Sequence, residues 1–238
     1  MLVNTTPTIV RENRLLTALP ACEYQRLVPY LKFVSLSSGQ ILYEAEEPIT
    51  RVYFPNNSLV SLIISTGNGS TVEVGCVGNE GIVGVPVILG SNTTTTSAVV
   101  QIAGNAMQMN ADILKSEFAC GRNLQKLLLS YVHALYAQAA QAAVCNRLHT
   151  LEARLARWLL TVSDRIQSNK LPLTQEYISL MLGVRRSGVT VAAGILSEQG
   201  IISYNRGNIT ILNRKGLEAI SCECYRLLKS EFARLLGN

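Results

Sequence analysis

The first 112 residues alternate between short apolar segments and turn-forming residues. Four of these segments surround two turns that contain Gly and Asn: residues 58–64 and 71–75 flank Thr66-Gly67-Asn68-Gly69, and residues 99–102 and 106–109 flank Gly104-Asn105. Each arrangement is typical of a β-hairpin. A short helix is predicted ahead of them, at residues 21–31. Many short strands with Gly and Asn turns predict a β-barrel or sandwich.

A helical pattern begins near residue 111. From residue 124 to residue 155 the chain has neither Pro nor Gly, is rich in Ala and repeats its apolar positions every three or four residues. Small residues such as Ala139 and Ala143 permit a second helix to approach closely, so we expect a parallel dimer contact along one stripe. The alternative is a helix that packs on its own domain. The stripe consists of Leu124, Leu128, Tyr131, Leu135, Gln138, Ala142 and Cys145.

The pattern changes again at about residue 151. The sequence then predicts, in order, a helix to about residue 167, a polar break at 168–170, a helical stretch at 173–199 interrupted at Gly183, and strands at 201–204 and 209–212 around Asn205-Arg206-Gly207-Asn208. A last helix is predicted from Lys215. The order of helix, helix-turn-helix and hairpin indicates a winged helix.

The residues around Gly183 fit a helix-turn-helix. Gly183 supplies a turn residue without a side chain, and Ser179 is small where the two helices come closest. Thr174 is expected to cap the first helix, with Gln175 and Glu176 in its first turn. The predicted apolar contact between the helices consists of Ile178, Leu182, Val184, Val189, Ala192 and Leu196.

Two adjacent arginines begin the second of these helices. The start of a helix has free N–H groups and the positive end of the helix dipole, so Arg185 and Arg186 would meet phosphates and base edges of DNA. Thr190 would contact a phosphate, and Val191 a thymine methyl group. The alternative is a pair of solvated arginines on a surface helix. The predicted DNA-binding residues are Thr174, Gln175, Arg185, Arg186, Ser187, Gly188, Thr190, Val191 and Arg206.

The distribution of charge supports a polyanionic partner. The net charge is +5, yet residues 1–150 contain nine basic and nine acidic residues, so the whole excess lies in residues 151–238. The uncharged stretch at residues 81–111 is interrupted by Pro86 and by several glycines, so it does not form a membrane span. The N-terminus shows no signal-peptide pattern. We therefore expect a cytoplasmic protein without a membrane partner.

Cysteine and histidine residues offer few sites for chemistry. The six cysteines are irregularly spaced, which is typical of reduced thiols. Cys145 with His149, and Cys222 with Cys224, are pairs that could bind a metal or haem, but two ligands are an incomplete site. Packing is the favoured interpretation, so no metal and no cofactor are expected. Since His133 and His149 are the only histidines and no catalytic set appears, an enzyme is disfavoured.

Residues 171–211 resemble the C-terminal domain of the Crp/Fnr family of bacterial transcription regulators. The stretches VYFPNNSLVSLI, VEVGCVGNEGIVGVPVILG and RLARWLL extend this resemblance over nearly the whole chain. It implies an α+β fold that acts as a homodimer on a two-fold-related site in double-stranded DNA. The implied domains are a cyclic-nucleotide-binding-like β-roll or jelly-roll sensor (1–118), a dimerisation helix (119–150) and a winged helix-turn-helix (151–238).

The sequence departs from the family pattern at the effector site. Members that bind cyclic nucleotides have a Gly-Glu pair for the ribose and an Arg-Ser pair for the phosphate, whereas this chain has Gly84-Val85 and Thr96-Ser97 at the matching places. No Arg or Lys occurs between Arg51 and Lys115, so a buried phosphate would have no cationic partner. Control by cyclic AMP in the usual mode is therefore not expected.

Two further departures leave other properties open. Cys22 is alone near the N-terminus, where oxygen-sensing members have a cluster of cysteines for an iron–sulfur centre. Val191 stands where the best-known members have an arginine, so the operator sequence is open. RNA polymerase or another protein is considered as a further partner. The rival hypothesis is a small-ligand sensor whose winged helix makes protein contacts.

Overall fold

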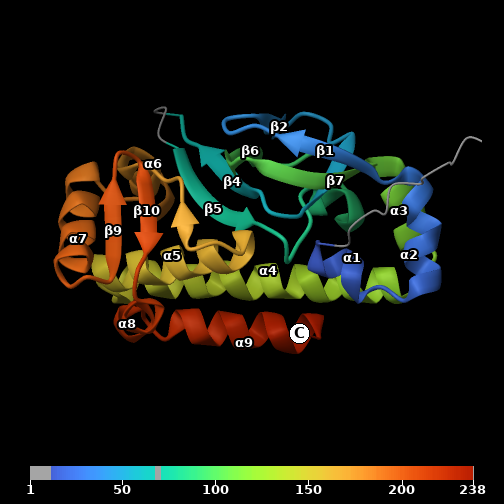
Figure 1. Cartoon of the computed structure of the whole chain (residues 1–238). Coiled ribbons are helices and arrows are strands. Elements are labelled where there is room, and N and C mark those ends of the chain that lie inside the picture. Colours follow the sequence, from blue (N-terminus) through green and yellow to red (C-terminus); the bar gives the residue numbers. More distant parts are fainter. Residues whose placement is uncertain (1–11, 68–70, 238) are drawn as a thin grey trace, which may run out of the picture.

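Seven strands in the first half of the chain form a β-roll. The computed structural model describes residues 12–67 and 71–237 (Figure 1). One antiparallel sheet has the order β1-β7-β3 and the other the order β2-β6-β4-β5. The strands are β1 (Lys32–Leu36), β2 (Ile41–Tyr43), β3 (Arg51–Pro55), β4 (Leu59–Ser65), β5 (Thr71–Val77), β6 (Ser97–Ile102) and β7 (Gly104–Asn110).

Only the first of the two predicted hairpins forms. Strands β4 and β5 are paired up to Ser65 and Thr71, although Asn68 and Gly69 of their turn lie outside the described residues. The pairing predicted around Gly104-Asn105 is wrong, because β6 pairs with β2 and β4 whereas β7 pairs with β1 and β3. A Cβ atom on Gly104 would lie 2.6 Å from Asn57 Oδ1. Gly104 therefore permits a close passage from one sheet to the other.

Short helices pack against the core of the β-roll. They are α1 (Arg14–Ala18), α2 (Ala21–Leu27), the 3-10 turn η1 (Val28–Tyr30) and α3 (Ala111–Ala119). The sequence predicted α2 but not α1. The position of α1 depends on the buried Asn13. The side chain of Asn13 caps α1 and donates to the carbonyl oxygens of Pro55 (2.8 Å) and Gly81 (2.9 Å). Nothing is described of residues 1–11, where the absence of a signal peptide was inferred.

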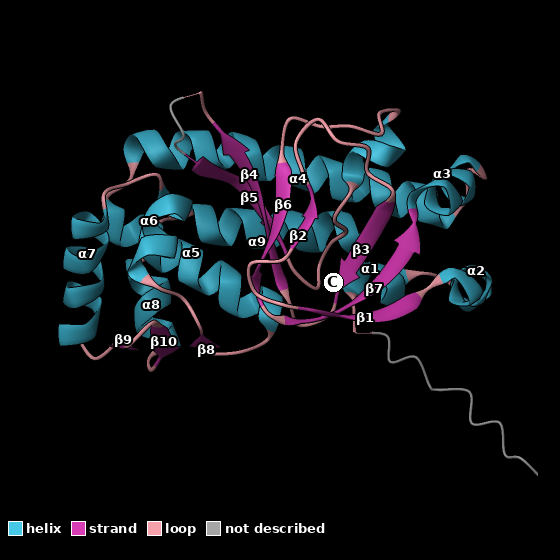
Figure 2. Ribbon diagram, turned by 90° about the horizontal axis from the view of Figure 1, so that it is seen from above, coloured by secondary structure: helices cyan, strands magenta, loops and turns pink. Residues whose placement is uncertain are grey.

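The helices predicted at residues 119–150 and from about 151 to 167 both form. The first, α4 (Asn123–Leu148), runs the length of the molecule, and α5 (Leu151–Ile166) follows after a break at His149 and Thr150 (Figure 1). The Thr150 side chain caps α5 by accepting a hydrogen bond from the N–H of Ala153. The C-terminal helix, α9 (Cys224–Leu236), lies along α4 in both views (Figures 1 and 2).

The stripe assigned to the dimer contact faces the chain's own core. The rings of Tyr131 and Phe232 meet edge to face with centroids 6.5 Å apart, so α9 covers this side of α4. The assignment of the stripe to a partner helix was therefore wrong, since a side chain buried inside one protomer offers no surface to another. Four residues of the stripe are buried: Leu124, Leu128, Tyr131 and Cys145. The other three are half-buried: Leu135, Gln138 and Ala142.

The last third forms the predicted winged helix. After α5 the elements are β8 (Lys170–Leu171), α6 (Gln175–Leu182), α7 (Arg186–Glu198), β9 (Ile202–Asn205), β10 (Asn208–Ile211) and α8 (Arg214–Ile220). The sheet order is β8-β10-β9, and the turn at Arg206 and Gly207 has positive φ at both residues. Among the described helices no single one is long and apolar enough to cross a membrane; α6 and α7 reach that length and composition only together, bent by 107°.

Candidate DNA-binding interface and domain junction

The first helix of the helix-turn-helix begins and ends at the predicted residues. The hydroxyl of Thr174 accepts a hydrogen bond from the N–H of Tyr177 at 3.2 Å and caps α6. Gly183 ends the helix with a φ of +62°, a left-handed conformation that favours glycine. Ser179 is buried, as expected of a small residue at the closest approach of the helices.

Apolar contacts set the angle between α6 and α7. Five of the six predicted contact residues are buried: Ile178, Leu182, Val189, Ala192 and Leu196. The sixth, Val184, is partly exposed and packs against the same core. Because one face of α7 is fixed on this core, the opposite face is directed to solvent. The buried face of α7 therefore determines which of its residues are available to DNA.

The N-terminal end of α7 is exposed. Arg185 precedes the helix in an extended conformation, and no side chain caps the helix there among the described residues. Arg186 and Ser187 are exposed, and Val191 lies further along the same face with 61% of its surface accessible. Free N–H groups and two guanidinium groups thus share one end of a helix, which is an arrangement that attracts phosphate.

The hairpin and α6 contribute to the same surface. Seven residues from the wing and the two helices line an open depression. Four of them are predicted to bind DNA: Thr174, Gln175, Arg186 and Arg206. The other three are Glu176, Tyr204 and Gly207. The N–H of Gln175 donates to the hydroxyl of Tyr204 at 3.2 Å, and the hydroxyl of Thr190 donates to Oε1 of Gln175 at 3.0 Å. Hydrogen bonds therefore position α6 relative to both the wing and α7.

Gly188 is the exception among the predicted DNA-binding residues. A Cβ atom at this position would lie 3.0 Å from Cδ2 of Leu151, so Gly188 faces α5. Its small size permits the helices to pack closely. Gly188 therefore has a packing role, and its contact with DNA stays a prediction.

A buried ion pair joins the winged helix to the β-roll. Nε of Arg165, on α5, lies 2.9 Å from Oε1 of Glu80, and both side chains are at most 7% exposed. Arg165 also donates to the carbonyl oxygen of Cys76 at 2.6 Å and to the side chain of Gln138 on α4. One guanidinium therefore contacts the β-roll, the long helix and the winged helix. Sequence analysis missed it, because these partners are far apart along the chain.

A second polar cluster lies where α6 contacts the β4–β5 hairpin. The hydroxyl of Ser61 donates to Oε2 of Glu73, and the hydroxyl of Tyr177 lies 2.7 Å from that of Ser61 and 3.4 Å from the same Oε2. The indole Nε1 of Trp158 lies 3.5 Å from Oε1 of the same carboxyl. Burial raises the pKa of Glu73 to about 7, although these hydrogen bonds, that of Ser61 first, act to lower it.

Two family models match the sequence. That of the cyclic nucleotide-binding domain matches residues 33–119, and that of the Crp-like helix-turn-helix domain matches residues 153–220. The chain belongs to the Crp/Fnr family of transcription regulators. The helix-turn-helix of this family implies DNA binding, and its members are transcription regulators rather than enzymes.

Solved structures of Crp/Fnr relatives share the fold. FixK2 from Bradyrhizobium japonicum has 17% identity and a TM-score of 0.69, over 81% of this chain and 98% of its own. A Crp/Fnr regulator from Thermus thermophilus has 22% identity and a TM-score of 0.62, over 80% and 98%. A CooA mutant from Carboxydothermus hydrogenoformans has 16% identity and a TM-score of 0.62, over 90% and 97%. None of the curated protein sequences matches the chain.

The residues assigned to an effector from the family pattern lie at the start of the 3-10 turn η2 (Val85–Leu89) and at the start of β6. Gly84, with a φ of +105°, packs against Val52 and precedes η2. The hydroxyl of Ser97 donates to Oε2 of Glu44 at 3.0 Å, and Thr96 lies beside Thr94. A carboxylate thus lies beside Ser97, one of the residues that the family pattern assigns to an effector. It would repel an anionic ligand.

A cavity of about 410 Å³ lies between the β-roll, α4, α5 and α9. Its lining includes Glu73, Gln138, Arg157, Arg165 and Lys229. The cavity is separate from Gly84, Val85, Thr96 and Ser97, the residues assigned to an effector from the family pattern. It borders both polar contacts of the junction, so a molecule bound there would contact the β-roll and the winged helix at once.

The structure also unites two pairs that sequence analysis treated as separate. Cys145 and His149 lie at the end of α4, Cys222 lies between α8 and α9, and Cys224 is the first residue of α9. Their ligand atoms all lie within 4.8 Å of one another. The reasoning that each pair offers only two ligands was wrong, because the return of α9 along α4 places all four residues together. The Cys-x-Cys and Cys-x-x-x-His spacings were the available signals.

Proposed function

We propose that this Crp/Fnr regulator binds a two-fold-related DNA site as a homodimer, with the N-terminal end of α7 in the major groove. The observation that carries the proposal is that the exposed Arg186 and Arg206 line one depression of the winged helix, with the exposed Arg185 next to Arg186. An arginine at the start of a recognition helix is able to donate two hydrogen bonds to guanine, whereas Arg206 at the wing tip would contact phosphates. The two recognition helices would lie about one DNA turn apart.

An exposed apolar face of α4 supports dimerisation. Because the opposite side of α4 is covered by α9, the partner helix would pack on the outer side. Four large apolar residues lie there, spaced by seven, eight and four positions, and each is at least 45% exposed: Leu129, Tyr136, Val144 and Leu148. The exposed Ala140 and Ala143 lie between them. Such spacing is typical of a coiled-coil contact, and a second copy of the same helix is its natural complement.

The effector position supports a regulator that is not controlled by cyclic AMP in the usual mode. The Ser97 hydroxyl is hydrogen-bonded to Glu44, and Arg51 and Lys115 are the nearest basic residues along the sequence on either side. A cyclic phosphate would therefore lose the charge-assisted hydrogen bond on which it depends. DNA binding without a ligand, or control by another molecule or protein, is the consistent alternative.

Selection of genomic DNA fragments on the ligand-free protein tests the proposal. The selected fragments are sequenced, and the affinity for the best one is measured against salt concentration. We expect an inverted repeat whose binding weakens steeply with salt, because arginine contacts to phosphate release counterions. No enrichment from a dimeric sample would contradict ligand-free DNA binding. Enrichment without salt dependence would favour the rival hypothesis, in which the winged helix contacts a protein.

A further inference from the structure

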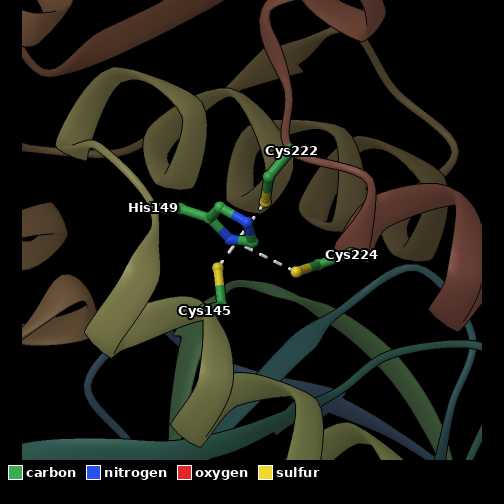
Figure 3. A group of neighbouring side chains, drawn as sticks. All are labelled: Cys145, His149, Cys222 and Cys224. Atoms are coloured by element: carbon green, nitrogen blue, oxygen red, sulfur yellow. Dashed lines mark hydrogen bonds between the residues drawn. The ribbon is translucent and has the colours of Figure 1, made fainter.

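Three sulfur atoms and one imidazole gather where α4 ends and α9 begins. Sγ of Cys145 lies 3.6 Å from Sγ of Cys222, and Sγ of Cys224 lies 3.5 Å from Nδ1 of His149 (Figure 3). Figure 3 shows the four side chains directed at a common centre from the α4 end and from the segment before α9. The three thiols are buried and unbridged.

These distances fit a tetrahedral metal ion. Zinc binds sulfur at about 2.3 Å and imidazole nitrogen at about 2.0 Å, so tetrahedral geometry separates its ligand atoms by about 3.5–3.8 Å. The observed separations of 3.6 Å and 3.5 Å agree with this spacing. Three thiols with one imidazole form a closed set of four, which is the composition of structural zinc sites. An iron–sulfur cluster would need its ligands further apart than 4.8 Å.

The geometry points to a binding site for a single zinc ion, coordinated by Cys145, Cys222 and Cys224 through sulfur and by His149 through Nδ1. Binding would release the three thiol protons to solvent and leave the imidazole neutral. The complex of three thiolates and Zn²⁺ would carry one net negative charge.

Neighbouring side chains suit such an ion. Nε2 of His149 lies 3.2 Å from Oε1 of Glu223, which directs Nδ1 toward the sulfur atoms. A carboxylate on the outer nitrogen of a ligand histidine is a frequent feature of zinc sites. The amide Nε2 of Gln141 donates to Sγ of Cys224 at 3.1 Å, which stabilises a thiolate.

Two arginines on α5 balance the negative charge. Arg154 and Arg157 interact electrostatically with Cys145, and the pKa of Arg154 is lowered chiefly by burial. The Nε atom of each is buried and has no hydrogen-bond partner among the described residues. Arg154 is buried and its guanidinium also donates to the carbonyl oxygen of Leu182, whereas Arg157 is half-buried. A buried cation is costly without an opposite charge, so a negatively charged metal complex beside Arg154 would stabilise the fold.

Such a site would act at the hinge of the molecule. His149 lies at the break between α4 and α5, Cys222 precedes the C-terminal helix and Cys224 begins it. Zinc would therefore fix the winged helix and α9 relative to the long helix. This inference is independent of whether the winged helix binds DNA.

Metal analysis of the untagged full chain tests the site. We expect elemental mass spectrometry to find about one zinc ion per chain. The cysteines of the same sample should be reduced. Cys222→Ser and Cys224→Ser should each lose most of that zinc, whereas Cys22→Ser and Cys120→Ser, at exposed thiols outside the cluster, should retain it. Protein that neither contains zinc nor takes up added Zn²⁺ would overturn the proposal. So would a disulfide between Cys145 and Cys222 in the natively purified protein.

Cobalt substitution of the unmutated chain avoids any loss of folding in a variant. Co²⁺ should give the intense visible absorption of a tetrahedral ion and a thiolate charge-transfer band. Weak octahedral absorption without the thiolate band would overturn the assignment. Glu223→Gln, which keeps all four ligands, should weaken zinc binding by about 10- to 100-fold. An unchanged affinity would remove Glu223 from the site.

Discussion

The hydroxyl of Tyr177 lies 2.7 Å from the hydroxyl of Ser61, so a side chain of the helix-turn-helix is hydrogen-bonded to a strand of the β-roll. The contact also includes Glu73 and the indole of Trp158, whose ring centroid lies 5.9 Å from that of Tyr177. The first helix of the DNA-binding unit is thus joined to the sensor-like domain at one polar cluster. A change in the β4–β5 hairpin would therefore act directly on the position of α6.

Tyr177→Phe should loosen this contact while retaining the aromatic packing. The loss of hydrogen bonds at a half-buried site costs on the order of 1 kcal/mol, and more if the Glu73 carboxyl loses a donor without replacement. For a chain of this size the melting temperature should fall by about 2–4 °C. Hydrogen exchange should increase in α6 and in the β4–β5 hairpin.

Tyr30→Phe is the matched control, since Tyr30 is 48% exposed on η1, away from the proposed dimer face of α4 in sequence and fold element. Its melting temperature and hydrogen exchange should match the unmutated chain. Equal exchange in α6 for Tyr177→Phe and the unmutated chain would contradict the role assigned to the cluster.

The pKa of Glu73 predicts a pH dependence of stability. Burial raises this pKa from 4.5 to about 7, so the folded protein binds a proton that the unfolded chain releases. Protonation of Glu73 stabilises the fold fully below pH 4.5, and this stabilisation is lost as the pH rises to about 7. Above that pH, Glu73 no longer changes the free energy of unfolding with pH. The free energy of unfolding from urea titrations should show this pH dependence in the unmutated chain.

Glu73→Gln should remove the part of the pH dependence of the free energy of unfolding that Glu73 causes, because the amide stays neutral at every pH. The informative quantity is the difference between the two proteins in the free energy of unfolding, since other carboxyl groups contribute equally to both. The unmutated chain should lose stability relative to Glu73→Gln between pH 4.5 and about 7. A difference that is constant with pH would show that Glu73 titrates normally.

The order of the elements was accessible from the sequence because local signals determine it. Gly183 with its positive φ and Thr174 with its capping hydroxyl fix the ends of α6 without help from distant residues. The hairpin at Arg206 and Gly207 is local in the same sense. Apolar spacing likewise predicted the buried residues between α6 and α7.

Features that depend on distant contacts were not accessible. The apolar stripe on α4 was assigned to a partner because nothing local indicates that Phe232 covers Tyr131. Periodicity identifies a buried face and leaves its occupant open. The same limit explains why Arg165 was not paired with Glu80, and why Cys145 was not grouped with Cys222.

Val144→Asp should weaken the proposed dimer. Val144 is 45% exposed on the outer face of α4, and a buried carboxylate without a cation is costly at a helix–helix contact. Sedimentation should show a shift from dimer to monomer without loss of helix content. The control is Val72→Asp, where Val72 is 40% exposed and lies on β5 rather than on the outer face of α4. A dimer that tolerates Asp at residue 144 would exclude this face.

Arg186→Ala should weaken binding to the selected DNA and relax the preference at one base position. Arg186 is exposed at the first turn of α7 and lines the same depression as Arg206, so its guanidinium is placed to reach a base edge. A hydrogen-bonded arginine–guanine pair contributes about 1–3 kcal/mol of discrimination, which corresponds to roughly 5- to 150-fold.

Arg206→Ala should instead lower affinity uniformly across sequences and reduce the salt dependence, because it removes a phosphate contact. Arg226→Ala, at an exposed arginine on α9, is the control for net charge. If Arg186→Ala changed binding no more than Arg226→Ala, α7 would not be the recognition helix in the proposed orientation.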